Sequence, residues 1–140
     1  MSDKTVIEYL SAHGIKPSVQ RIAVMRYLME HLTHPSVEDI YAALHDDIPT
    51  LSKTTVYNTL KLLVEQGAVM MITIDERTTK YDADCSRHAH FLCSACNSIA
   101  DIALPEDAPS HTLPRNFVLH NTQIYYRGLC PECAARQQNT

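Results

Sequence analysis

Four of the five cysteines form two Cys-x-x-Cys pairs, Cys93/Cys96 and Cys130/Cys133. Each pair can hold one side of a tetrahedral Zn²⁺, and four thiolates leave no open coordination position, which is typical of a structural site. A redox dithiol or two unrelated pairs are the alternatives, but no βαβ pattern of the thioredoxin type surrounds these residues. We therefore predict a structural zinc site that stabilises a small domain. Cys85 has no partner in this pattern and is interpreted as a spare thiol.

A second group of possible ligands combines histidine with aspartate. His88 and His90 alternate on a predicted strand, so both side chains point to the same face. Asp82 precedes them, Asp101 lies on the next predicted strand, and His34 lies in the N-terminal half. If all five converge, three imidazoles and two carboxylates form a site that suits Fe²⁺ or Mn²⁺. The spacing does not establish this convergence, and an ordinary surface or core histidine pair is the alternative.

The elements that must position these residues fall into two parts. Residues 4–66 have a helical periodicity. One helix is expected to start at Ser36, with Asp39 as its capping-box partner, and another to run from Ser52 to Gly67. A predicted hairpin around "DERT" follows, which gives the order of a winged helix-turn-helix. The last of these helices would bury Val56, Leu60 and Leu63 and expose Lys53, Thr54, Tyr57, Asn58 and Lys61. That polar face either reads the DNA major groove or is simply solvated.

After Asp84 the pattern becomes that of strands. "HAHFLC", "SIADIAL" and "FVLHNTQIYY" are the predicted strands, and the prolines of the segment 105–114 argue against a long helix there. We predict an α+β protein with an N-terminal winged-helix domain and hinge, residues 1–83, and a small α/β domain, residues 84–140.

Bulk composition restricts the possible functions. The 140 residues carry a formal net charge of −4, so a DNA contact requires a local basic face or charge supplied by bound metal. No apolar run approaches the roughly 20 residues of a membrane helix, and the N-terminus has no signal-peptide pattern. A cytoplasmic protein without a membrane partner is expected. A metalloenzyme and a zinc-stabilised interaction module are the other classes considered, but no general base or pocket for a small organic substrate is evident.

The motifs "GIKPSVQR", "THPSVEDIYAAL", "TTVYNTLKLLVEQGAV", "KYDAD", "HAHFLCSAC" and "GLCPEC" together resemble the ferric uptake regulator superfamily along nearly the whole chain. The resemblance implies a homodimeric, metal-dependent repressor, not an enzyme, that binds a palindromic operator in double-stranded DNA. It implies structural zinc on the four paired cysteines and regulatory Fe²⁺ or Mn²⁺ on His34, Asp82, His88, His90 and Asp101. The DNA contacts that it implies are Arg21, Ser52, Lys53, Thr54, Thr55, Tyr57, Asn58 and Lys61.

Aspartate at both Asp82 and Asp101 resembles the peroxide-sensing branch of this superfamily. In that branch, Fe²⁺ reacts with peroxide and the resulting oxidant adds oxygen to a ligand histidine, here His34 or His88. An iron sensor controlled by metal occupancy alone is the alternative. A further site that many members have is expected to be absent, because Arg87, Ala89 and Thr122 occupy its positions. His111 and His120 are interpreted as surface or structural histidines.

Overall fold

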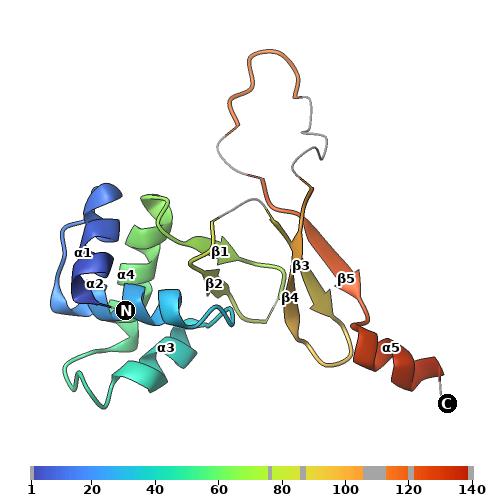
Figure 1. Cartoon of the computed structure of the whole chain (residues 1–140), viewed down its shortest axis with the longest axis horizontal. Coiled ribbons are helices and arrows are strands. Elements are labelled where there is room, and N and C mark those ends of the chain that lie inside the picture. Colours follow the sequence, from blue (N-terminus) through green and yellow to red (C-terminus); the bar gives the residue numbers. More distant parts are fainter. Residues whose placement is uncertain (1, 76, 86–87, 106–112, 120–121, 139–140) are drawn as a thin grey trace. The chain divides into compact units, whose positions relative to one another are not determined.

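The computed structural model describes the chain apart from residues 1, 76, 86–87, 106–112, 120–121 and 139–140. It divides into two compact units, Met1–Cys85 and Ser86–Thr140. The described part of the first unit holds four helices and a hairpin, and that of the second holds a three-stranded sheet and one helix (Figure 1). This composition confirms the predicted α+β class. Assignment of a function to each part of the chain stays a prediction.

The helices of the first unit all begin at a serine. Each serine hydroxyl accepts a hydrogen bond from the backbone N–H three residues further on, and such a cap stabilises a helix by about 1 kcal/mol relative to alanine. The predicted starts at Ser36 and Ser52 are confirmed, as is the stop at Gly67, which has a φ of +77°. The helices are α1 (Asp3–Ala12), α2 (Val19–Glu30), α3 (Val37–Leu44) and α4 (Lys53–Glu65).

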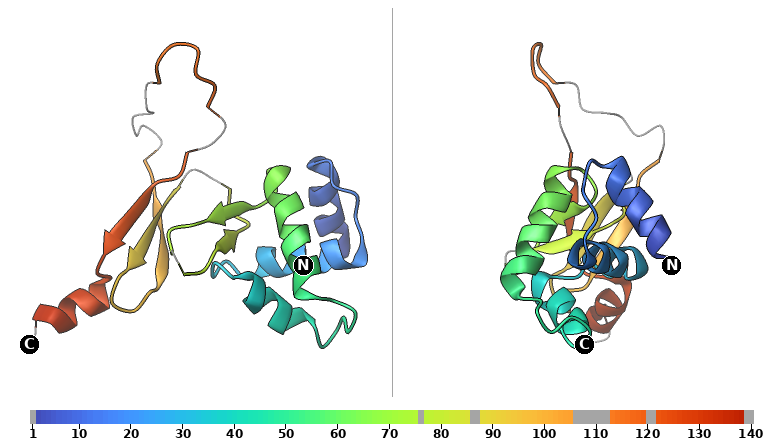
Figure 2. Two further views of the ribbon diagram at one scale, coloured as in Figure 1. Left: turned by 180° about the vertical axis from the view of Figure 1, so that it is seen from behind. Right: turned by 90° about the vertical axis from the view of Figure 1, so that its left-hand side faces the viewer.

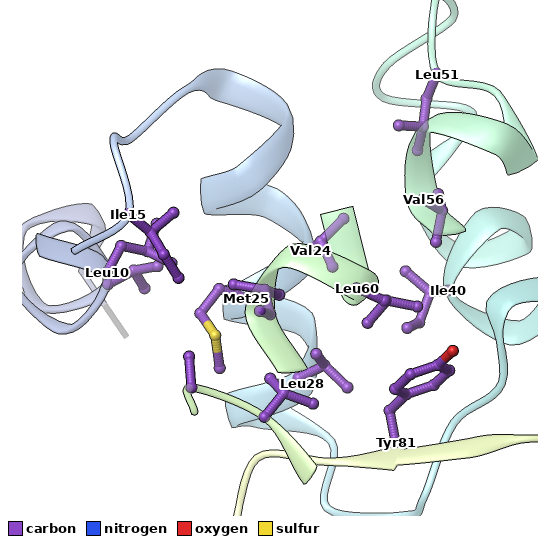
Figure 3. Close-up of a cluster of buried hydrophobic side chains, with 14 residues drawn as sticks. Leu10, Ile15, Val24, Met25, Leu28, Ile40, Leu51, Val56, Leu60 and Tyr81 are labelled. Atoms are coloured by element: carbon purple, nitrogen blue, oxygen red, sulfur yellow. The ribbon is translucent and has the colours of Figure 1, made fainter. Parts of the chain in front are cut away.

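The apolar side of α4 packs into the core of the first unit. Val56, Leu60 and Leu63 are fully buried, as the helical periodicity predicted. Side chains of α2, α3 and α4 point into this common core, and Tyr81 lies at its edge (Figure 3). Because one side of α4 is committed to the core, the opposite side, with its polar residues, faces solvent.

The hairpin that follows α4 consists of β1 (Met70–Ile72) and β2 (Lys80–Asp82), which pair antiparallel with Met71 opposite Tyr81. The backbone N–H of Tyr81 donates a hydrogen bond of 2.9 Å to the carbonyl of Pro35, in the loop between α2 and α3. This bond ties β2 to the segment that carries His34. The helices and hairpin therefore follow the predicted winged-helix order.

The second unit is built around a central strand. β3 (His88–Cys93) pairs antiparallel with β4 (Ile99–Ala103) and parallel with β5 (Tyr125–Gly128), so the sheet order is β4-β3-β5 (Figure 2). α5 (Pro131–Gln138) follows β5 directly. The central position of β3 brings residues of β4 and of β5 beside it, although some thirty residues separate β3 from β5 in the sequence.

Two details of this unit differ from the prediction. The expected strand "FVLHNTQIYY" was wrong over most of its length, because β5 begins only at Tyr125. Asn116 has a φ of +75° in a turn after Pro114, and Phe117 to Leu119 are exposed, so this stretch has no strand conformation where the structure describes it. The helix α5 was missed, although Pro131 occupies a favourable first-turn position. Residues 106–112 of the proline-containing segment lie outside the described residues.

Candidate metal centre and nucleic-acid interface

The four paired cysteines converge at one end of the sheet of the second unit. Cys93 ends β3, Cys96 follows in a turn, Cys130 precedes α5 and Cys133 lies within it. Their sulfur atoms all lie within 4.8 Å of one another, and those of Cys96 and Cys130 are 4.0 Å apart. Four thiolates around Zn²⁺ at about 2.3 Å are separated by about 3.8 Å, whereas a disulfide requires about 2.05 Å. The geometry therefore fits structural Zn²⁺, as the spacing predicted.

Sheet pairing assembles these cysteines from two distant segments. Cys93 lies opposite Gly128 in the parallel pairing of β3 with β5. Both the backbone N–H and the hydroxyl of Ser94 donate to the carbonyl of Gly128, at 2.8 and 3.0 Å. The Cβ of an alanine at Gly128 would lie 3.2 Å from the Phe91 ring, so the close approach of the two strands favours glycine. Hydrogen bonds to the backbone thus hold the two Cys-x-x-Cys segments together, and a bound Zn²⁺ would link them further.

Hydrogen bonding sets the protonation of the cysteines without metal. Hydrogen bonds from the backbone of Cys130 and Cys96 lower the pKa of Cys93 to about 6. Side-chain hydrogen bonds with Cys130, the larger cause, and with Cys93 raise the pKa of Cys133 to about 12. The four clustered thiols therefore differ in how easily they lose a proton. The four cysteines would hold Zn²⁺ as thiolates, because the charge of the ion would stabilise all four deprotonated sulfur atoms.

In the first unit the structure brings together His34 and Asp82. His34 lies between α2 and α3 with a φ of +59°, and its Nε2 is 3.4 Å from Oδ2 of Asp82. Both residues are almost fully buried, at 6% and 2% exposure. The other oxygen of Asp82 accepts a 2.9 Å hydrogen bond from the backbone N–H of Asp84. The hydrogen bond from Tyr81 to Pro35 fixes the backbone beside both residues, so one nitrogen and one oxygen ligand are positioned together.

In the second unit the structure brings together His88, His90 and Asp101. His90 and Asp101 are opposite each other in the pairing of β3 with β4, and His88 lies on the same face of β3. The Nε2 atoms of the two histidines are 3.0 Å apart. Oδ1 of Asp101 lies 3.5 Å from Nε2 of His88 and 3.4 Å from Nε2 of His90. Ligands of an octahedral ion at about 2.1 Å are separated by about 3.0 Å. Two imidazoles and a carboxylate at these distances suit Fe²⁺ or Mn²⁺.

The exposed face of α4 carries the residues predicted to contact DNA. Lys53, Thr54, Tyr57, Asn58 and Lys61 are exposed, and Tyr57 retains 52% of its accessible surface. Two surface hollows flank the helix. One of about 610 Å³ is lined by residues of the α2 start and of α4, including Lys16, Ser18, Arg21, Thr55 and Asn58. The other, of about 550 Å³, is lined by residues of α3, α4 and the hairpin, including Lys53, Tyr57, Arg77 and Thr78.

Three of the predicted DNA contacts have a structural task as well. Ser52 caps α4, and its hydroxyl lies 2.9 Å from that of Thr55. Nη1 of Arg21 donates to the carbonyl of Lys16 at 2.8 Å, which holds the loop before α2. These side chains are therefore partly engaged within the domain, whereas Tyr57 and Asn58 are exposed residues.

Comparison with known proteins decides the family. The sequence model of the Ferric uptake regulator family matches residues 12–127. The chain belongs to this family. It is 32% identical to the peroxide operon regulator of Bacillus subtilis (strain 168), over 97% of this chain and 96% of that protein. It is 33% identical to the peroxide-responsive repressor PerR of Staphylococcus aureus (strain Mu50), over 91% and 88% of the two chains.

A solved structure of a peroxide-responsive regulator is also similar to this chain. The chain of PerR from Streptococcus pyogenes, described for peroxide sensing and gene regulation, has a TM-score of 0.53 and 27% identity over 94% of this chain and 92% of that one. The relatives are regulators, so a metalloenzyme is not the supported class. Among the described residues, no helix combines the length and the hydrophobicity that crossing a membrane requires.

The remaining sequence predictions can be placed for this member of the ferric uptake regulator family. The Cys85 thiol lies 3.8 Å from the carbonyl of Gly67, and its pKa is raised by burial and then by Asp82 and Asp84. Cys85 is exposed, and its interpretation as a spare thiol stays a prediction. Ala89 is buried in β3, whereas Arg87, His111 and His120 lie outside the described residues. Absence of a further metal site stays a prediction.

Sequence reasoning missed several positioning residues. Ser98 hydrogen-bonds to Cys96 and to the backbone of Cys93. Ser94 bonds to Gly128, and Pro35 accepts from Tyr81, the residue before Asp82. All of these contacts depend on tertiary structure. Serine and proline at these positions give no signal by type or spacing. Ser94, which directly follows Cys93, and Ser98, two residues after Cys96, lie near the predicted zinc ligands in the sequence.

Proposed function

We propose that this chain is a homodimeric, metal-dependent transcriptional repressor that responds to peroxide. The observation that carries the proposal is the convergence of His88, His90 and Asp101 within 3.5 Å on β3 and β4. Its donors suit a redox-active ion, and the curated relatives described above are a peroxide operon regulator and a peroxide-responsive repressor. Together these support a metal-controlled regulator over a purely structural role for the histidines.

The proposed regulatory ligands come from both units. The pair His34 and Asp82 offers one nitrogen and one oxygen, and the group on β3 and β4 offers two nitrogens and one oxygen. One ion held by all five residues would be five-coordinate and would leave room for a further ligand. Such an ion would also restrict the arrangement of the two units, so metal occupancy would change which arrangement is populated.

Bound Fe²⁺ would supply the one-electron chemistry by which peroxide leads to oxygen addition on a ligand histidine. His34 and His88 are the proposed targets of this oxidation. Their part is to hold the ion through imidazole nitrogens, and an oxidised imidazole binds it less well. Asp82 and Asp101, which lie 3.4 and 3.5 Å from the rings of His34 and His88, would balance the charge of the ion. Mn²⁺ or Zn²⁺ on the same ligands would leave the histidines unmodified.

The DNA-binding part of the proposal rests on α4. Its exposed face would enter the major groove, where Tyr57 and Asn58 would contact base edges and Lys53 and Lys61 the phosphates. A homodimer would present two such helices to two half-sites, so the operator would be palindromic. The exposed apolar residues of the second unit support self-association there: Ile102, Leu113, Phe117, Val118, Leu119 and Tyr126.

The experiment that tests the proposal loads the purified protein with Fe²⁺, adds less than one equivalent of peroxide and maps oxidation by mass spectrometry. Trypsin releases residues 27–53, which contain His34, and residues 88–115, which contain His88. We expect each modified peptide to gain the mass of one oxygen atom, and fragmentation to place it on His34 or His88. DNA binding to a selected palindromic duplex should fall in parallel.

The peptide that contains His34 also contains internal controls. His31 and His45 are exposed histidines within residues 27–53, and neither belongs to the proposed ligand set. A protein loaded with Mn²⁺ should bind DNA and show no added oxygen. Oxygen spread evenly over His31, His34 and His45 would contradict oxidation directed by the site. Metal-dependent DNA binding without any oxidation would favour the iron sensor controlled by occupancy.

A further inference from the structure

The four cysteines of the candidate zinc site differ in their exposure. Cys93 is fully buried, whereas Cys96 belongs to an exposed turn and Cys130 and Cys133 are intermediate. A ligand exchanged by an external chelator must leave the metal on a side that the chelator can reach. Cys96 is therefore the sulfur atom at which zinc loss is expected to begin.

The serine two residues further on contacts this sulfur atom. Oγ of Ser98 lies 3.1 Å from Sγ of Cys96. A zinc-bound cysteine is a thiolate and has no proton to donate, so in the zinc-loaded protein the hydroxyl must be the donor. A hydrogen bond donated to a thiolate stabilises its negative charge. The hydroxyl of Ser98 is positioned to donate such a bond to Cys96.

The backbone fixes Ser98 where this contact forms. The N–H of Cys93 donates to the Ser98 carbonyl at 3.0 Å, and the N–H of Asn97 donates to the Cys93 carbonyl at 2.8 Å. Asn97 has a φ of +63°, which closes the turn, and β4 begins immediately after Ser98. Ser98 is therefore held between the last residue of β3 and the first of β4.

A second serine in the same turn has a different contact. The hydroxyl of Ser94 donates to the carbonyl of Gly128 and joins the two strands that carry the cysteines. Ser94 is exposed like Ser98, and the two differ in that one hydroxyl bonds to a carbonyl and the other to a zinc ligand. Removal of the two hydroxyls thus separates a loss of strand linkage from a loss of thiolate stabilisation.

We propose that Ser98 is a positioning residue of the zinc site, whose hydroxyl donates to the Cys96 thiolate and slows zinc loss from the exposed side. The proposal rests on Zn²⁺ as the occupant of the four cysteines. Hydrogen bonds from the surroundings to metal ligands commonly contribute 10- to 100-fold in metal affinity. Ser98 is expected to act in this way on Cys96, a ligand residue that is exposed to solvent.

The test measures zinc transfer from the purified full-length protein to a chromophoric chelator. Ser98→Ala should transfer zinc about 10- to 100-fold faster than the wild type, Ser98→Thr should restore a rate near wild type, and Ser94→Ala should change the rate less than about threefold. Equal rates for Ser98→Ala and wild type would overturn the proposal. So would an equally fast Ser94→Ala, because it would assign the effect to the strand linkage. A wild type without tightly bound zinc would overturn the zinc assignment itself.

Cobalt substitution gives a readout that a purely structural role would not move. A hydrogen bond to a thiolate withdraws electron density from sulfur, so its loss should shift the thiolate-to-Co²⁺ charge-transfer band to lower energy. We expect this shift in Ser98→Ala but not in Ser98→Thr or Ser94→Ala. Identical bands in all four proteins would show that the hydroxyl does not donate to a ligand sulfur atom.

Discussion

Replacement of Ser36 by alanine removes the cap of the helix that follows His34. Oγ of Ser36 accepts the N–H of Asp39 at 3.2 Å, and Asp39 Oδ2 accepts the N–H of Ser36 at 3.0 Å. Loss of an N-cap serine costs about 0.5–2 kcal/mol. Ser36 is only 4% exposed, so water replaces the lost acceptor poorly and the cost should fall in the upper part of this range. We expect Ser36→Ala to lose about 1–2 kcal/mol.

This loss is large enough to measure in the full-length protein. For a domain of this size about 1 kcal/mol lowers the Tm by about 4–8 °C, so a decrease of about 5–15 °C is expected by circular dichroism at 222 nm. Four of the five described helices belong to the first unit, and the helical signal therefore reports mainly on it. Ser36→Thr, which can still cap, should lose less. A Tm for Ser36→Ala within 2 °C of wild type, taken here as about the error of the measurement, would refute the reasoning.

Two further changes test the first unit. Gly67→Ala should lower the free energy of urea unfolding by about 1–2 kcal/mol, because the φ of +77° is unfavourable for alanine. No atom lies within 4 Å of the added Cβ, so a steric clash is not the cause. Gly67→Asn should cost less, and equal costs for the two variants would contradict a backbone origin. Burial, and then Tyr57 and Glu38, raise the pKa of Tyr81. The folded state therefore holds this proton more tightly than the unfolded state, and the resulting stability is complete below about pH 10 and decreases as the pH rises through the folded pKa. Tyr81→Phe should flatten the loss of stability above about pH 10, and parallel curves for both proteins would exclude this role.

Local rules account for the parts of the fold that the sequence predicts well. Serine caps and a left-handed glycine act within one helical turn, so the starts at Ser36 and Ser52 and the stop before Gly67 follow from neighbouring residues. The strand at His88–Cys93 follows from its apolar composition. By contrast, the stretch after Asn116 has strand-forming residues but no pairing partner where the structure describes it, and composition alone does not supply one.

The candidate metal sites also contain some residues that local sequence patterns predict and others that only tertiary contacts reveal. The paired cysteines reveal themselves because their spacing is itself the geometric requirement. The alternation of His88 and His90 predicts a shared face, but only the register of β3 with β4 places Asp101 opposite His90. Ser98 could not be predicted because its task depends on one hydroxyl contact of 3.1 Å. Residue type identifies ligands, whereas the residues that hold them are identified by tertiary contacts.

Under the proposed function, the regulatory ligands fall into two groups. His34 and Asp82 would supply two donors from the first unit, and His88, His90 and Asp101 would supply three from the second. Fe²⁺ and Mn²⁺ bind weakly to a site that offers only two or three nitrogen and oxygen donors. Neither group alone is therefore expected to retain the ion. Under the proposed function, tight binding requires both groups, and the free energy of binding is then available to select one arrangement of the units. Oxidation of a single histidine would weaken the whole set, because each group depends on the other for its affinity. That dependence would make one added oxygen atom sufficient to release the repressor from DNA.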